Sequence, residues 1–341
     1  LAQLPASRLS QAEHRLAYGV TSLYAGDGKQ ALRSLANLES ELPALAKELR
    51  QWRRTAMATV GPFEDAANAY LKSVGVKPEQ RAQLSRLPYA DKSPVKLFVL
   101  AGHRNMEGER AFTQNLSHDP DRKKLLRNQK QIPFRYQLGG GYLASKNWEP
   151  LGPTGYYDTF GPELSFGEAL RKTKDNIAIA KFTHSGSQIV DWTPEGSKAK
   201  SRNLYPQFIQ FIKDSISDLK TRGHTVELEG IFYHVGENDM SFGPFRQQSP
   251  AWIEALIRQS RIDLKQPDLR WFVFQQPPTD HEQVNSIDVT AELARVSKAD
   301  PNWIHVRAFD LPKQDKQLVL DESGIIALGN LMAVEYQNAE N

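Results

Sequence analysis

The chain has 341 residues, 40% of them hydrophobic and 24% charged, a composition typical of a globular protein with one large core or two modest ones. Its 43 basic and 40 acidic residues leave a net charge of +3, which is too small to indicate nucleic-acid binding on electrostatic grounds. The absence of cysteine excludes disulfides, thiol catalysis and thiolate metal sites, and no apolar run is long enough to span a membrane.

Residues 1–90 have the apolar spacing of helices. Apolar side chains recur at three- and four-residue steps in two runs, and a turn with two glycines at 26–28 separates them. We interpret the region as a helical extension of the domain that follows, and its basic segment 50–54 as a solvated helix face. The expected helices are a hairpin over 16–24 and 32–42, a third helix through 45–52, and shorter ones at 63–74 and 78–87.

From residue 95 onward, strand-like runs alternate with amphipathic helical stretches. The clearest helix is 204–222, where Phe208, Ile212 and Leu219 share one face and Gly223 supplies a left-handed stop. Alternation of this kind implies right-handed crossovers, so we predict a doubly wound α/β/α domain over 95–341 with a parallel five-stranded sheet. Its strands are expected at 95–101, 177–182, 229–235, 270–275 and 304–309, and its other helices at 162–172, 250–264, 287–298 and 323–336.

The segment 113–160 does not follow this alternation. It has little periodicity, a basic cluster between Arg122 and Lys130, three glycines at 139–141 and several aromatic residues. Long insertions without regular structure are usually functional lids or disordered. Because this one follows the first strand, we expect it to lie over the carboxyl edge of the sheet and to shape a binding site there.

The first strand ends in a polar turn that reads Gly102-His103-Arg104-Asn105-Met106-Glu107-Gly108. This turn resembles block I of the SGNH hydrolases, in the sialate O-acetylesterase-like branch that usually reads Gly-Gln-Ser-Asn-Met-x-Gly. The resemblance continues over 95–336 in the family's order, and it implies an SGNH-hydrolase, flavodoxin-like fold and an ancestry in carbohydrate ester hydrolysis. The further blocks are Gly161-Pro162-Glu163 for the Gly-Pro-Glu segment, 181–192 for the glycine block, 233–239 for Trp-His-Gln-Gly-Glu-x-Asp, and 318–324 for the closing block.

At the catalytic positions this chain departs from the family's pattern. The nucleophilic serine falls on Arg104, and a guanidinium has neither a nucleophilic lone pair nor an accessible deprotonated form. The oxyanion-contributing glutamine falls on Val235, the catalytic histidine on Val319, and its acidic partner on Lys316, beside Asp315. These groups act as a unit, so we expect a protein that is inactive as a serine esterase and assign no catalytic residue. The vestigial positions are Arg104, Gly186, Val235, Glu237 and Val319.

The residues around these positions predict a binding site. Arg104 would lie near a helix N-terminus, and the two together favour an anion such as a carboxylate, sulfate or phosphate. Alternatively, Arg104 pairs with Glu237 or Asp239 and fills the old site. Histidines at strand ends could ligate a metal, but their spacing does not support one, and we predict neither metal nor cofactor. The candidate ligand-binding residues are His103, Arg104, Asn105, Gly186, Ser187, His234, Glu237, Asn238 and Asp239.

Three functions follow. The favoured one is a catalytically degenerate carbohydrate-esterase-fold protein that binds a glycan or small anionic ligand in the vestigial cleft. The second is an active carbohydrate O-acetylesterase, with Glu237 or Asp239 as the base for water and Arg104 as the oxyanion donor. The third is a non-enzymatic interaction or structural module. We expect no nucleic-acid partner and no membrane span, and the start at Leu1, together with the resemblance, favours export to the periplasm or the outside.

Overall fold

The computed structural model describes residues 10–25, 27–58, 83–139, 143–155, 158–197, 203–241, 243–277, 289–312 and 319–340. The chain divides into two compact units, Leu1–Arg81 and Ala82–Asn341. Residues 83–90, which the sequence grouped with the helical region, belong to the second unit, where the Leu84 amide donates to the Trp148 carbonyl at 2.8 Å. Within the described ranges, no helix is both long and apolar enough to cross a bilayer.

The first unit is helical, with a small leucine-rich core. A capping box begins its first helix, since Ser10 Oγ accepts from the Glu13 amide at 3.3 Å and the Glu13 carboxylate accepts from the Ser10 amide at 2.8 Å. Residues 83–87 are not helical, which corrects that part of the predicted helix 78–87, and the predicted helix 63–74 lies outside the described residues. The elements are α1 (Gln11–Tyr24), α2 (Gly28–Ser34), α3 (Leu38–Glu41), η2 (Pro43–Leu45) and α4 (Ala46–Ala58).

One residue of the basic segment 50–54 has a structural role. Arg53 is buried, its Nε donates to the Leu35 carbonyl at the end of α2 at 2.8 Å, and its Nη1 lies 3.2 Å from Glu39 Oε1. The interpretation of the whole segment as a solvated face is therefore wrong for Arg53, which satisfies a carbonyl that the helix end leaves without a helical partner.

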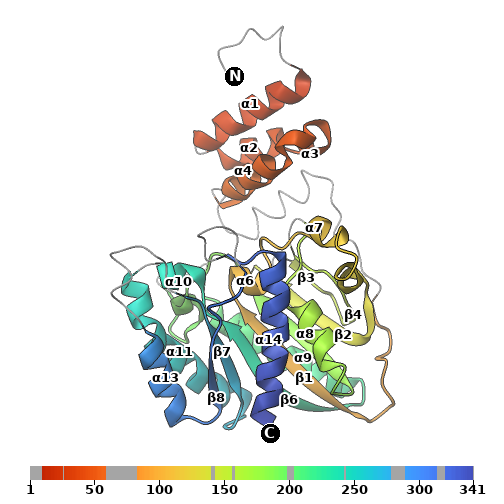
Figure 1. The fold of residues 1–341 in the computed structure, drawn as a ribbon, viewed down its shortest axis with the longest axis vertical. Coiled ribbons are helices and arrows are strands. Elements are labelled where there is room, and N and C mark those ends of the chain that lie inside the picture. Colours follow the sequence, from red (N-terminus) through yellow and green to blue (C-terminus); the bar gives the residue numbers. More distant parts are fainter. Residues whose placement is uncertain are drawn as a thin grey trace. The chain divides into compact units, whose positions relative to one another are not determined.

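The second unit is built on a twisted, mainly parallel sheet (Figure 1). Over the described residues the sheet has eight strands in the order β3-β2-β5-β1-β6-β7-β8, with β4 also paired to β2. Its bounds are β1 (Pro94–Gly102), β2 (Gln129–Leu138), β3 (Leu143–Ala144), β4 (Glu149–Leu151), β5 (Ile177–Thr183), β6 (Thr225–His234), β7 (Trp271–Gln275) and β8 (Trp303–Arg307). The five predicted strands are β1 and β5 to β8, all parallel, so the parallel doubly wound sheet is confirmed.

The prediction of five strands was too low, because β2, β3 and β4 come from the segment 113–160. β2 pairs in parallel with β5, and β3 and β4 pair antiparallel to β2. The alternating residues Ile132, Phe134, Tyr136 and Leu138 are buried, while polar residues at 129–131 and a proline at 133 interrupt the strand pattern in the sequence. The same segment contains two short helices, α7 (Thr113–Ser117) and η3 (Lys123–Leu126).

Helices cover both faces of the sheet. Val95, Leu97 and Val99 of β1 belong to one apolar cluster, with side chains of α9 (Tyr205–Thr221), α11 (Gly243–Leu264) and α13 (Thr290–Ala299). Phe98 and Leu100 belong to the other, with α8 (Glu163–Leu170) and α14 (Glu322–Glu340). Because successive residues of a strand point to opposite faces, β1 is buried on both sides at the centre of an α/β/α sandwich. The predicted stop of α9 is confirmed, since Gly223 has a φ of +90°.

The strand order reverses at β1. The chain passes from β1 to β2 and β5 on one side and then to β6, β7 and β8 on the other. In open α/β sheets, ligands bind outside the carboxyl ends of the strands at such a point. Three short helices follow the strands that meet there, namely α6 (Arg104–Glu107) after β1, η4 (Ile189–Trp192) after β5 and α10 (Glu237–Ser241) after β6.

Candidate ligand-binding site

The turn after β1 is held tightly against β6. Gly102 has a φ of +143°, and a Cβ added to it would lie 2.7 Å from the His234 carbonyl oxygen. Gly108 ends α6 with a φ of +85°, and a Cβ there would lie 1.8 Å from the Phe160 carbonyl oxygen. Both positions need glycine, and together they fix where residues 103–107 lie.

His103 forms part of the buried floor of the site. Its Nδ1 lies 3.0 Å from the Ser187 carbonyl oxygen, and because a carbonyl only accepts, Nδ1 carries the proton. Nε2 then accepts from the Tyr233 hydroxyl at 2.7 Å. Burial lowers the pKa of His103 to about 3, so the ring is neutral. Both ring nitrogens are therefore used within the protein.

The loop after β5 combines buried and open positions. Ser187 is buried, and its Oγ accepts from Trp192 Nε1 at 3.0 Å and donates to the His184 carbonyl at 2.7 Å. Gly186 has a φ of +79°, and no atom lies within 4 Å of where its Cβ would be. Ser187 therefore anchors the loop, whereas Gly186 borders open space.

Asn105 joins four parts of the fold. Its amide donates to Glu237 Oε1 at 2.9 Å, its Nδ2 donates to Gln276 Oε1 at 2.9 Å, and its Oδ1 accepts from the Leu320 amide at 2.8 Å. Burial raises the pKa of Glu237 to about 7, against the lowering effect of Arg104 and of the Asn105 amide. Asn105 and Glu237 thus lock the α6 turn to the ends of β6 and β7 and to the chain before α14.

Two further predicted residues of the block 233–239, Asp239 and His234, are buried. Asp239 is 0% exposed, with both carboxylate oxygens accepting from the Ile189 amide at 3.1 and 3.0 Å, and burial raises its pKa to about 8. His234 is 0% exposed, and burial lowers its pKa to about 4. Asn238 belongs to α10, and its side chain lies outside the described residues. The structure thus places Asp239 and His234 inside the protein.

Arg104 is the predicted residue that reaches the surface. Its side chain is 36% exposed, and its Nε lies 3.5 Å from Glu109 Oε2. The ion pair is thus made with Glu109 and not with Glu237 or Asp239, the two partners that the sequence suggested. Ser185 Oγ donates to the same Glu109 oxygen. Sequence reasoning missed both Glu109 and Ser185, although Ser185 lies two residues after β5 and directly before Gly186, where strand-end residues collect.

A buried ion pair contacts α6 through the Glu107 carbonyl. Lys181 Nζ lies 2.8 Å from Glu163 Oε2, with both side chains fully buried, and it also donates to the Glu107 carbonyl at 3.3 Å. The Glu107 carboxylate accepts from Thr183 Oγ1 and from the Ser185 amide, each at 3.1 Å. Burial raises the pKa of Glu107 to about 7. The sequence did not reveal this network, because Lys181 occupies an otherwise apolar strand.

The two residues that the sequence resemblance aligns with the family's oxyanion glutamine and catalytic histidine, Val235 and Val319, are apolar and buried. Val235 is fully buried, its amide donates to the Phe274 carbonyl at 2.9 Å, and Val319 is also buried. Lys316 and Asp315 lie outside the described residues. Among the residues that the structure describes, no three histidine, aspartate or glutamate side chains are grouped as metal ligands would be.

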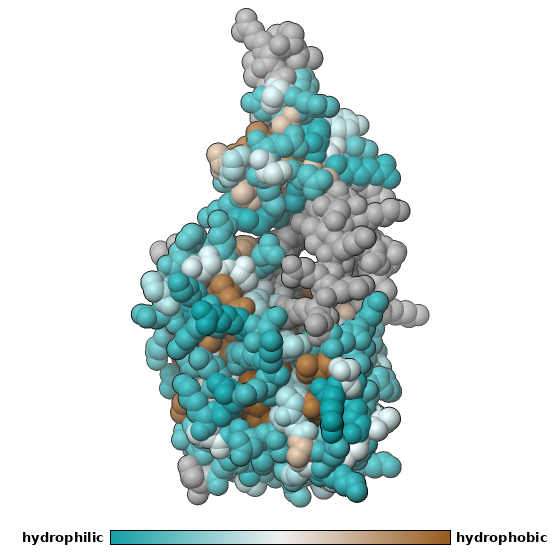
Figure 2. All heavy atoms as spheres, turned by 90° about the vertical axis from the view of Figure 1, so that its right-hand side faces the viewer, coloured by the Kyte–Doolittle hydropathy of each residue, from teal (hydrophilic) through white to brown (hydrophobic). Residues whose placement is uncertain are grey.

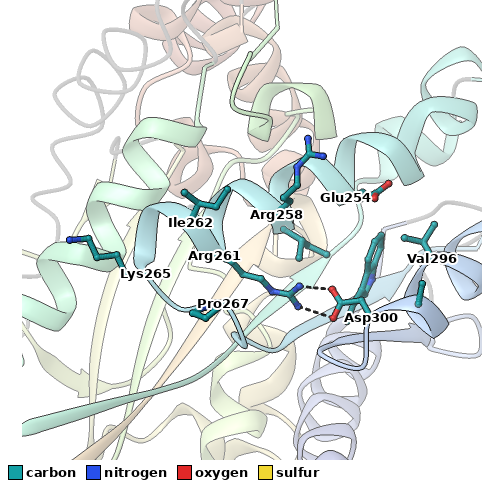
Figure 3. Close-up of a pocket in the computed structure, with 11 residues that line it drawn as sticks. Glu254, Arg258, Arg261, Ile262, Lys265, Pro267, Val296 and Asp300 are labelled. Atoms are coloured by element: carbon teal, nitrogen blue, oxygen red, sulfur yellow. Dashed lines mark hydrogen bonds and ion pairs between the residues drawn. The ribbon is translucent and has the colours of Figure 1, made fainter.

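A cavity of about 680 Å³ lies elsewhere, between α11, α13 and the start of β8 (Figure 3). Its walls include Ile257, Ile262, Val296 and Trp303, and the Arg261–Asp300 ion pair crosses it (Figure 3). None of the predicted site residues lines this cavity, which is next to the amino end of β8. The cavity is therefore separate from the site at the carboxyl ends of β1, β5 and β6.

The parallel sheet, its two helical layers and the site at the reversal of strand order define an SGNH-like α/β/α hydrolase fold. The family model for carbohydrate esterases of the sialic acid-specific acetylesterase type matches residues 94–338, and the chain belongs to this family. No curated protein sequence matches the chain.

Solved structures have the same fold. A protein of Arabidopsis thaliana is 18% identical, with a TM-score of 0.54, over 72% of this chain and 98% of that one. A carbohydrate acetylesterase from Xanthomonas citri is 17% identical, with a TM-score of 0.50, over 71% of this chain and 56% of that one. At these identities the likeness establishes the fold alone.

Proposed function

We propose that this chain is a catalytically degenerate member of its family that binds an acidic carbohydrate at the carboxyl ends of β1, β5 and β6. The observation that carries the proposal is the partly exposed side chain of Arg104, a residue that the family resemblance aligns with the nucleophile. A guanidinium cannot attack an ester carbonyl, but its planar donors match a carboxylate. The family's reaction is thereby lost and a cation is gained at the same place.

The surroundings of Arg104 support binding over acyl transfer. Val235 and Val319 offer neither an oxyanion donor nor a base, and His103 is neutral with both nitrogens in use. Glu237 and Asp239 accept hydrogen bonds from backbone amides inside the protein. Carboxylates held in this way are poorly placed to take a proton from water. Gly186, which directly follows Ser185 in the loop after β5, borders open space. An acidic sugar would place its carboxylate on Arg104 and displace Glu109.

Titration calorimetry with monosaccharides tests this function. Sialic acid and galacturonic acid should bind the wild type, whereas neutral galactose should not, because only the acids carry a group for Arg104. Arg104→Ala should abolish the binding of acids, and Arg104→Lys should retain a weaker part of it, since a lysine keeps the charge but loses the planar fork. Arg258→Ala, which removes an exposed arginine of the remote cavity, serves as the matched control. Equal binding of acids by wild type and Arg104→Ala would overturn the proposal.

Ester hydrolysis by a displaced serine is the second candidate. The observation in its favour is the hydrogen bond from Ser185 Oγ to the Glu109 carboxylate, beside the Arg104 cation. In such a reaction Ser185 Oγ would bond to the acyl carbon and pass its proton to Glu109. Arg104 would face the developing oxyanion, and the bond to the alcohol would break as the alcohol leaves with that proton. Water that gives its proton to Glu109 would then attack the acyl carbon, the bond to Ser185 Oγ would break, and the proton would return to Ser185 as the acid leaves.

Covalent labelling decides between the two candidates. A fluorophosphonate that modifies Ser185, together with hydrolysis of 4-nitrophenyl acetate that disappears in Ser185→Ala, would support the hydrolase. Ser217→Ala removes an exposed serine of α9 and is the matched control. We expect no labelling at Ser185 and no hydrolysis above that of Arg104→Ala.

A further inference from the structure

The segment before β2 presents a dense group of cations that the cleft does not use. Residues 122–131 contain five basic residues and no acidic one. Within the described residues, Lys124 pairs with Glu168 at 3.8 Å and Arg122 with Asp119 at 3.3 Å. Among residues 122–131 and 171–172, the exposed cationic side chains with no ion pair or hydrogen bond within the described residues are Lys123, Arg127, Lys130 and, after α8, Lys172.

These cations lie on one face, which we call the basic face and define as residues 122–131 and 171–172. The Lys124–Glu168 pair ties η3 to α8, and Arg171 Nη1 donates to Gln131 Oε1 at 3.2 Å, which ties the end of α8 to the start of β2. The side of the molecule that carries β2 and β4 is turned to the viewer in Figure 2, where its surface is largely hydrophilic. The cations therefore point into water from neighbouring elements.

Hydrogen bonds connect this face to the turn after β1. Asn105 Oδ1 accepts from the Leu320 amide at 2.8 Å, and two residues later Glu322 Oε1 accepts from the Phe112 amide at 3.2 Å. The next residue, Ser323, accepts from Arg122 Nη1 at 2.7 Å. The start of α14 thus contacts both the α6 turn and η3, which places these two elements beside the same helix end.

The spacing of the cations excludes a single small anion as their ligand. They belong to a helical turn, a strand and a helix end, and do not converge on one point. Exposed ion pairs contribute about 0–1 kcal/mol each, so such a surface becomes effective when one molecule offers several anions in a row. The ligand is therefore a chain with repeated charges.

The composition of the face selects among polyanions. Residues 122–131 include no aromatic side chain, so bases of a single-stranded nucleic acid would find no stacking partner there. The exposed large hydrophobic residues of the described chain are Tyr18, Ile262 and Val334, and none belongs to this face. A membrane surface, which apolar side chains must enter, is thereby disfavoured as well.

We propose that the basic face binds an acidic polysaccharide, a glycan with carboxylate or sulfate groups along its length, that extends from the cleft over η3 to the start of β2. The proposal rests on the proposed function in one respect, that the cleft holds one acidic unit of this glycan. The basic face supplies the affinity for the units that follow.

The test uses two triple variants of the full chain that remove the same charge. Lys123→Gln/Arg127→Gln/Lys130→Gln neutralises the basic face, and Arg258→Gln/Lys265→Gln/Lys298→Gln neutralises exposed cations of α11 and α13 as the control. Polygalacturonate and heparin are titrated against both variants, the wild type and Arg104→Ala over a range of salt concentrations. Circular dichroism and thermal melting confirm that each variant is folded.

We expect the basic-face variant to bind both polymers roughly tenfold more weakly, with a shallower salt dependence, because about 1.4 kcal/mol of screened attraction is lost. The control should bind like the wild type. Arg104→Ala should lose the acidic monosaccharide but keep most of the polymer affinity, which separates failure of the cleft from failure of this face. An equal loss in both triple variants would show an effect of net charge alone and overturn the proposal. The proposal would also be overturned if single-stranded DNA bound the wild type as tightly as the two polysaccharides and lost as much affinity in the basic-face variant.

Discussion

Arg104 Nε lies 3.5 Å from Glu109 Oε2, so the cation at the end of β1 has its counterion on the same turn and not on the neighbouring strand β6. Glu109 is itself held by Ser185. A ligand anion must therefore compete with a carboxylate that is already in place. The Arg104 side chain is nevertheless 36% exposed, so this pair does not enclose the cation.

Removal of this competitor is expected to tighten the binding of anions. In Glu109→Gln, Arg104 loses its counterion, and since a partly exposed pair is worth about 0.2–1 kcal/mol, affinity for galacturonic acid should rise about two- to fivefold. Titration calorimetry at low salt measures the change, and Glu168→Gln, which removes a carboxylate paired with Lys124, is the control. Weaker binding by Glu109→Gln would mean that Glu109 contacts the ligand and does not compete with it.

Introduction of the serine and the histidine that the family resemblance aligns with Arg104 and Val319 should produce little activity. Arg104→Ser/Val319→His returns a hydroxyl and an imidazole, but Val235 still provides no side-chain oxyanion donor, and Val319 is buried where a polar ring costs free energy. Hydrolysis of 4-nitrophenyl acetate should stay close to that of Arg104→Ala/Val319→Ala. Activity at the level of a working esterase would show that only these two positions were lost, and would undercut a new binding role.

Glu237 should make the stability of the second unit depend on pH. Its folded pKa is about 7 and its ordinary value is 4.5, so between these values the unfolded state loses a proton that the folded state keeps. Stability therefore falls as pH rises through this window, and it is unaffected by this group below pH 4.5. Glu237→Gln cannot ionise, so its stability relative to wild type should increase by up to about 3 kcal/mol across the window.

Urea unfolding at several pH values from about 4 to 8 measures this difference. His103 and His234 act in the opposite direction, because their lowered pKa values make stability rise with pH up to about 6.5. The difference between wild type and variant cancels the histidines, since both proteins contain them. A constant difference across the pH range would show that Glu237 has the same pKa in the folded and unfolded states.

The central fold could be predicted from the sequence because its signals are local. The apolar run before Gly102, the amphipathic face of α9 and the glycine after it each specify an element without reference to the rest of the chain. β2 was missed although Ile132, Phe134, Tyr136 and Leu138 alternate, because the lysine and glutamines before them resemble the polar loop that precedes. The short strands β3 and β4 give weaker signals still, since their edge position depends on pairing with β2.

The contacts of the site could be predicted less well, because they depend on side-chain direction. Glu237 lies in the block 233–239 that the sequence highlighted, yet its carboxylate accepts a hydrogen bond from the Asn105 amide. The ion pair with Arg104 is made by Glu109, which is much closer to Arg104 in the sequence. Lys181 gave no signal as the partner of Glu163, because the two residues are 18 positions apart and meet only once α8 packs on the sheet. Spacing indicates which residues reach the strand ends, and packing decides which of them pair.

Gly108 should be far less tolerant of substitution than another glycine with the same backbone conformation. Gly108 and Gly223 have φ values of +85° and +90°, so alanine is strained at both, by roughly 1 kcal/mol. At Gly223 the new Cβ meets nothing within 4 Å, whereas at Gly108 it would lie 1.8 Å from the Phe160 carbonyl oxygen. Gly108→Ala must therefore displace the α6 turn, while Gly223→Ala need not move its surroundings. Thermal melting should show a small loss for Gly223→Ala and a much larger one for Gly108→Ala, and the latter should also lose its affinity for galacturonic acid. Equal losses in the two variants would mean that the contact with Phe160 does not hold the turn.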